Sequence, residues 1–163
     1  MAKIERKYLA HYINTAAPAE GDAAYERLGK DLEEYSPELS AQVDTKKNIL
    51  GETSIVISSY EKTASVEPYY AEKGDALFTR LQDIIDNQLV LDELKTDVVE
   101  VKLWEGEKDS TSFPAYKEEA YIEVTSYGGD TTGYQIPFTL RYTGVKVKGT
   151  FDVKTKTFTA AAG

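Results

Sequence analysis

Two residue types that carry much of protein chemistry are scarce in this chain, which contains no cysteine and a single histidine. The absence of cysteine excludes disulfides, thiolate nucleophiles and cysteine-based zinc sites. His11 would have to act as the base of any Ser-His-Asp triad, but the chain has no G-x-S-x-G nucleophile motif. We therefore favour a solvated or packed surface histidine, and we predict no catalytic residue.

Motifs for phosphate and metal binding are missing as well. The glycines at 128 and 133, and those at 144 and 149, have the spacing of a phosphate loop, but neither pair is followed by the required lysine and hydroxyl residue. The segment 128–133 holds one carboxylate, too few for a calcium loop. Acidic pairs arise by chance in a chain with 28 acidic residues, so an enzyme that uses acids alone is a remote alternative. We predict no cofactor and no metal site.

Long apolar runs are absent too, so no helix is expected to span a membrane, and the N-terminal residues 1–16 lack the apolar centre of a secretory signal. The 28 acidic residues outnumber the 19 basic ones, which disfavours tight binding to DNA phosphates. Twelve tyrosines suit half-buried sheet faces or interfaces. A length of 163 residues fits a single domain that spans 1–163.

The first half of the chain gives mixed signals. Residues 14–24 are small and polar, and predict a loop or a flexible arm. Residues 25–36 fit a short helix or a strand with a turn equally well, because Gly29 weakens the helix. Alternating apolar positions predict a half-buried strand in 38–45, and a further strand follows in 54–61.

One segment has a clear helical period. Within residues 75–88, apolar side chains recur at helical spacing and form a single stripe: Leu77, Phe78, Leu81, Ile84 and Ile85. Asp75 follows a glycine and is a natural N-cap. An amphipathic helix of this kind must pack against another layer, and a sheet is the available partner.

The second half is richest in strand patterns, which cover 97–106, 120–127, 134–142, 144–151 and 154–160. Pro137 predicts an edge strand or a bulge, because proline cannot donate to a sheet ladder. The one long loop that we expect spans 105–119. These patterns predict a mainly β, α+β fold: an antiparallel β-sandwich or barrel-like sheet with one flanking amphipathic helix.

Basic residues gather near the C-terminal end of this acidic chain. Residues 141–156 contain one acid and five basic residues, which are Arg141, Lys146, Lys148, Lys154 and Lys156. Residues 18–38 contain seven acids and two basic residues. If the two segments lie on opposite surfaces, the basic face of one copy can meet the acidic face of another, an arrangement that generates rings or filaments. The alternative is that the lysines only keep an exposed edge strand solvated.

The run "RLGKDLEEYSPELSAQVDTKKNILGETSIVISSYEKTASVEPYYA" at 27–71 resembles the N-terminal half of phage major tail proteins, the tail tube subunits of Gram-positive siphophages and related phage-like particles. The helix pattern and the ending "IPFTLRYTGVKVKGTFDVKTKTFTA" resemble the C-terminal half of that family. The likeness covers about residues 25–160, although the family usually carries tryptophan where this chain has Tyr25.

The resemblance implies a β-sandwich with a flanking helix, hexameric rings and rings stacked into a hollow tube. It implies that the partners are copies of the chain itself, a tape-measure protein, and tail tip and terminator proteins. It also implies that DNA passes through the lumen without specific binding, and that the protein is assembled in the bacterial cytoplasm and ends in the virion tail. An acidic lumen wall would let the phosphate backbone slide.

Two other functions stay open. One is the inner tube of a contractile tail or bacteriocin, which the sequence barely separates from the first. The other is a monomeric β-sandwich that binds carbohydrate or a host surface, for which exposed aromatics would have to share a concave patch. The aromatic residues available for such a patch are Tyr69, Tyr70, Tyr116, Tyr121 and Tyr127.

Overall fold

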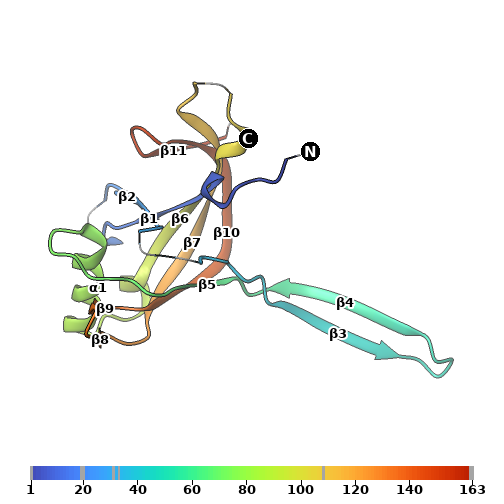
Figure 1. Cartoon of the computed structure of the whole chain (residues 1–163). Helices are drawn as coiled ribbons and strands as arrows, with labels where there is room; N and C mark the ends of the chain where they lie inside the picture. The colour runs from blue at the N-terminus through green and yellow to red at the C-terminus, as the bar shows by residue number, and fades with distance from the viewer. Residues whose placement is uncertain (1, 19–20, 31, 33, 108, 162–163) are drawn as a thin grey trace.

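The computed structural model describes residues 2–18, 21–30, 32, 34–107 and 109–161. Within these residues, a strongly curled antiparallel sheet carries one α-helix, and a long two-stranded arm extends away from the body (Figure 1). Parts of two sequence-based predictions lie outside the described residues. These are residues 19 and 20 of the expected loop, and the acids at 20, 31 and 33 of the acidic segment.

The main sheet has the strand order β11-β10-β7-β6-β1-β2, and β5 also pairs with β10. Every pairing in it is antiparallel. Its strands are β1 (Leu9–Asn14), β2 (Tyr25–Arg27), β5 (Thr63–Val66), β6 (Lys95–Lys102), β7 (Ser112–Val124), β10 (Phe138–Asp152) and β11 (Thr157–Ala160). The remaining short elements are β8 (Gly128–Asp130), β9 (Gly133–Gln135) and the 3-10 turns Arg6–Tyr8, Leu91–Leu94 and Leu103–Glu105. The predicted mainly β fold is confirmed.

Helix α1 (Ala76–Asn87) covers one face of this sheet, and Asp75 caps it by accepting a hydrogen bond from the Leu77 amide at 3.2 Å. Its stripe Leu77, Leu81 and Ile84 is buried in a cluster with β-strand residues, which include Ile13, Val98, Ile122, Phe138 and Leu140. The predicted helix and its cap are therefore confirmed. No helix among the described residues is long and apolar enough to cross a membrane.

A second apolar cluster lies on the opposite face of the sheet, and it shows why the sheet curls. Tyr12 of β1 packs against Phe151 of β10, with ring centroids 4.5 Å apart, although β7 and β6 lie between these strands in the sheet order. This contact requires the end of β10 to bend over the sheet. The cluster also contains Ala10, Val99, Val101 and Ala115.

The structure corrects several sequence-based expectations and decides one that the sequence left open. Residues 105–119 are not one long loop, because β7 begins at Ser112 and runs unbroken to Val124. Pro137 lies between β9 and β10 rather than within a strand. The two strands predicted at 134–142 and 144–151 are joined, because β10 continues through Gly144. Residues 25–27 form β2, so the strand alternative holds for the start of the segment 25–36.

The largest correction concerns the segments predicted as strands at 38–45 and 54–61. Within the part of the chain that the structure describes, strands β3 (Ala41–Lys47) and β4 (Thr53–Tyr60) pair only with each other. A strand does overlap the predicted segment 38–45, but every residue of β3 and β4 is exposed, so the prediction that the strand is half-buried is wrong. The alternation of apolar residues is real, but no part of the described chain covers either face. We call the segment 41–60 the β3–β4 arm.

Candidate self-association surface

The β3–β4 arm presents an apolar surface to solvent along its whole length. Val43, Ile55, Val56 and Ile57 are each more than half exposed. A two-stranded hairpin without a covering layer is marginally stable in water, and a contiguous exposed apolar patch marks an interaction site. The arm therefore carries the apolar residues that are typical of a buried hairpin, but it leaves them exposed to solvent.

The tip of the arm is built as a defined turn rather than a loose loop. The Asn48 side-chain oxygen accepts hydrogen bonds from the Leu50 amide at 2.9 Å and the Glu52 amide at 3.0 Å. Gly51 adopts a φ of +82°, a conformation that favours glycine. This turn presents Ile49, which is fully exposed, and Leu50, which is 76% exposed.

The five basic residues predicted at an interface do not form one patch. Lys146 and Lys148 lie on the same face of β10, and the Lys146 ammonium sits 4.4 Å from the Tyr116 ring centroid. Lys154 and Lys156 belong to the turn between β10 and β11, next to Asp152, which accepts from the Lys154 amide. The Arg141 Nε lies 2.6 Å from Glu123 Oε2 within the chain. Their role at an interface stays a prediction.

His11 is buried in a polar cluster between the sheet and the segments that cover it, rather than lying at the surface. Its Nε2 lies 3.3 Å from Glu100 Oε2, and its ring makes an edge-on contact with Tyr35. The Lys62 ammonium joins the cluster through Glu118, at 2.8 and 3.1 Å from the two carboxylate oxygens. We call these four side chains, His11, Lys62, Glu100 and Glu118, the buried ionic cluster.

Hydrogen bonding by His11, together with the charges of Lys62 and Lys146, lowers the pKa of Glu100 to about 2. A carboxyl whose pKa is lowered on folding adds stability above its ordinary pKa and loses it as the pH falls. Through these contacts the cluster links β1, β6 and β7, which carry His11, Glu100 and Glu118. Among the described residues, no group of three or more potential metal ligands occurs.

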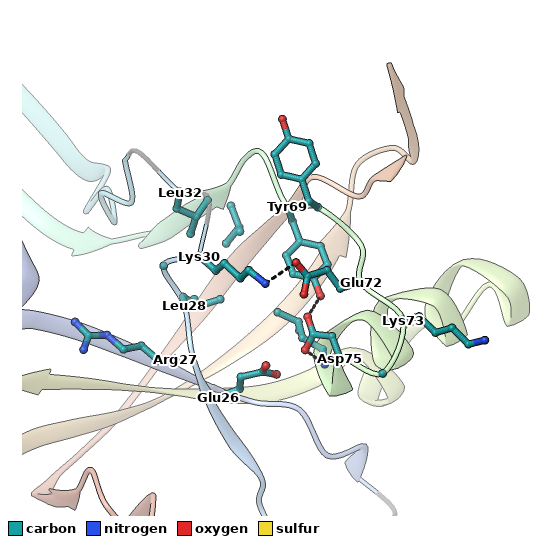
Figure 2. A pocket seen from close by; sticks show the side chains of 14 residues that line it. Glu26, Arg27, Leu28, Lys30, Leu32, Tyr69, Glu72, Lys73 and Asp75 are labelled. Carbon is teal, nitrogen blue, oxygen red and sulfur yellow. Dashed lines mark hydrogen bonds and ion pairs between the residues drawn. The ribbon is translucent and has the colours of Figure 1, made fainter. Parts of the chain in front are cut away.

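A surface pocket of about 400 Å³ lies at the start of α1, between β2 and the segment that leads into the helix. Figure 2 shows Glu26 and Asp75 next to each other, with the Tyr69 hydroxyl donating to Asp75 and Lys30 paired with Glu72. Glu26 Oε2 is buried and has no hydrogen-bond partner within the described chain. Burial and the neighbouring Asp75 carboxyl raise the pKa of Glu26 to about 6.

Replacing Glu26 with glutamine is expected to stabilise the protein at neutral pH. A carboxyl whose pKa is raised on folding costs stability when it ionises, so its cost is absent below about pH 4.5 and complete above about pH 6. Solvent screening limits the gain to about 1 kcal/mol. Urea unfolding at pH 7 and pH 4 measures it, and an equal gain at both pH values would contradict the titration. Glu72→Gln, at the exposed side of the pocket, is the control.

The five tyrosines considered for a ligand patch are dispersed. Tyr69 and Tyr70 precede α1, whereas Tyr116 and Tyr121 lie five residues apart in β7 and therefore point to opposite faces of the sheet. Tyr127 follows β7 and is 64% exposed. Of this set, Tyr69 and Tyr70 both line the pocket at the start of α1, and the described structure does not gather all five tyrosines into one concave patch.

No protein-family model and no curated protein sequence matches the chain. A solved structure does: the SPP1 tail tube, determined by solid-state NMR and cryo-EM, superimposes with a TM-score of 0.61. The alignment covers 90% of this chain and 78% of that chain, at 19% sequence identity. At this identity the likeness establishes a shared fold.

Proposed function

We propose that this chain is a tail tube subunit of a phage or phage-like particle, which assembles with copies of itself into rings stacked as a hollow tube. The fold shared with the SPP1 tail tube supports this role. The observation that carries it is the β3–β4 arm, whose apolar side chains have no covering layer within the described chain. A repeating assembly of identical copies supplies that layer, because every copy brings both an arm and a receiving surface.

The finer features belong to the same proposal. The rings are hexameric, the particle infects a Gram-positive host as a siphophage, and the subunit meets a tape-measure protein and tail tip and terminator proteins. The protein is assembled in the host cytoplasm and becomes part of the virion tail. A non-enzymatic, architectural role fits the chain, since its only histidine is bound within the buried ionic cluster.

Passage of DNA without specific binding is supported by the sheet face opposite α1. On that face Lys95 pairs with Glu119 at 3.3 Å and Arg141 pairs with Glu123 at 2.6 Å. Basic groups that are paired with acids within the chain offer little to phosphates, because counterion release needs free cations. We therefore propose that this face lines the lumen.

The test is whether the purified protein forms such an assembly. We expect sedimentation velocity to show a shift from monomer to large particles as the concentration rises, and negative-stain microscopy to show rings or tubes of uniform diameter. A protein that stays monomeric at every concentration, also in the presence of a crowding agent, would overturn the proposal. A shift to irregular aggregates would do so as well, since a closed symmetric interface gives one particle width.

A further inference from the structure

The outer edge of β10 is covered at both ends and open in the middle. On this side, β5 pairs with residues 138–141 and β11 pairs with residues 149–152. Two further main-chain hydrogen bonds mark the borders: the Tyr142 amide donates to Lys62, and the Ala161 amide donates to Lys148. Between these borders, no described strand pairs with residues 143–147 on the outer side. We call residues 143–147 the β10 gap.

The β10 gap has the geometry of a strand-binding edge. The Tyr142 amide and the Lys148 carbonyl both point to the outer side. Every second residue of a strand directs its main-chain N–H and C=O to the same side, so those of Lys146 point outward too. The pairing of β10 with β7 shifts register between Tyr142 and Lys146, and Gly144 adopts a φ of +93° within this bulge. An open edge of this length invites pairing with another strand.

The side chains of the gap divide into two faces. Val145 and Val147 lie on the face opposite α1, and Val145 is 53% exposed. Lys146 lies on the other face with Lys148 just beyond the border, which makes that face basic. A strand that fits the gap therefore needs apolar side chains on one face and uncharged or acidic side chains on the other.

Strand β4 meets this requirement. Its open edge carries no charged residue between Thr53 and Tyr60, Ile55 and Ile57 share one face, and Val56 lies on the other. Strand β3 does not meet the requirement, because it would bring Lys46 and Lys47 beside the lysines of β10, and like charges across a ladder are destabilising.

The strand must come from a second copy. The β4 strand leads directly into β5, which lies beside β10, yet the arm leaves the body at this point and extends away from it (Figure 1). The gap and the strand that fits it are thus separated within one molecule but available between molecules. A contact between the arm of one copy and the β10 gap of the next is a head-to-tail contact, and such contacts generate rings or filaments.

We propose that the β10 gap receives strand β4 of a second copy as an added antiparallel strand, with Val56 opposite Lys146. Both strands that flank the gap run antiparallel to β10, so the inserted strand continues that pattern. This register places Ile55 opposite Val147 and Ile57 opposite Val145, within the borders of the gap. The inference rests on the proposed function, because it identifies how one subunit binds the next.

The absence of cysteine makes this register measurable by disulfide formation. We design two single variants, Val56→Cys and Lys146→Cys, on chains with different tags, mix them, let them assemble and oxidise them mildly. Directly opposed residues in an antiparallel pair lie within disulfide reach. We expect mixed disulfides at least about tenfold above those of the control pair Val56→Cys with Lys156→Cys, because a held pair reacts at a high effective concentration. The mixed pair reports only contacts between molecules.

The outcomes separate this inference from the proposed function. Rings or tubes without the mixed disulfide would overturn the β4 register but leave the tube assembly intact. A stronger disulfide from Val43→Cys with Lys146→Cys would assign the gap to β3 and overturn the inference as well. Failure of the unmodified chain to assemble would count against both.

If a cysteine variant fails to assemble, amide exchange of the unmodified chain decides. We expect the Lys146 amide and the amides of the open β4 edge to exchange at least about tenfold more slowly in the assembly than in the monomer. Unchanged exchange at Lys146 in assembled tubes would overturn the inference.

Discussion

Replacing Ile55 and Ile57 with aspartate is expected to abolish self-association while leaving the monomer folded. Each isoleucine contributes about 1.5–3 kcal/mol when it is buried against a neighbour, so removing both weakens a subunit contact by on the order of 100-fold or more. Both side chains are solvent-exposed in the single chain, and no other strand among the described residues pairs with the arm. The melting temperature of the monomer should therefore shift by no more than about 2 °C.

Sedimentation velocity and calorimetry on the same samples measure the two effects separately. The matched control is Ile55→Val with Ile57→Val, which keeps β-branched apolar side chains and should keep assembly. A second control, Thr79→Asp with Asn87→Asp, adds the same charge to exposed positions of α1. Normal tubes from the aspartate variant would show that the arm is not part of the subunit contact. A large loss of melting temperature would show instead that the arm supports the fold of the single chain.

The arm also marks the limit of sequence-based prediction for this fold. Alternating apolar residues at 38–45 and 54–61 identify strands correctly, because side chains in a strand alternate between two faces. The same pattern cannot tell what covers an apolar face, since the covering layer can belong to another molecule. By contrast, the stripe of α1 and the β10–β11 pair were predictable, because their partners lie within the chain.

Strand β7 shows a second limit of sequence-based prediction. The segment 112–119, which contains Lys117, Glu118 and Glu119, falls within the loop expected at 105–119. In the structure Glu118 is only 6% exposed, since Lys62, 56 residues earlier, neutralises it. A long-range ion pair of this kind leaves no local signal. The prediction of a surface position for His11 is wrong for the same reason, because its partner Glu100 lies 89 residues away in the sequence.

The buried ionic cluster gives the second large expected effect. Replacing Lys62 with methionine should destabilise the folded chain by about 3 kcal/mol at neutral pH, because it leaves Glu118 buried without its counterion. The Lys62 and Glu118 side chains are 16% and 8% exposed, so water screens the abandoned carboxylate poorly. Lys62 also lies 3.8 Å from Glu100, which loses part of the charge that lowers its pKa. Urea unfolding measures the loss.

The double variant Lys62→Met with Glu118→Leu separates an unpaired charge from lost packing. Well-packed apolar residues in place of a buried ion pair are often neutral or stabilising, so the double variant should recover most of the stability that the single variant loses. A double variant as unstable as the single one would mean that the contact of the Lys62 ammonium with the Tyr142 ring, whose centroid lies 4.7 Å away, matters more than the pairing with Glu118.

The pH dependence of the same variants completes the argument. The pKa of Glu100 is lowered to about 2, so the wild-type chain should lose stability as the pH falls from about 4.5 towards 2. The Lys62→Met variant should lose less over that interval, because one of the charges that lowers the pKa of Glu100 is gone. The gap in unfolding free energy between the two proteins should therefore narrow with acidification. A constant gap from neutral to acidic pH would show that the cluster is held by packing and not by charge.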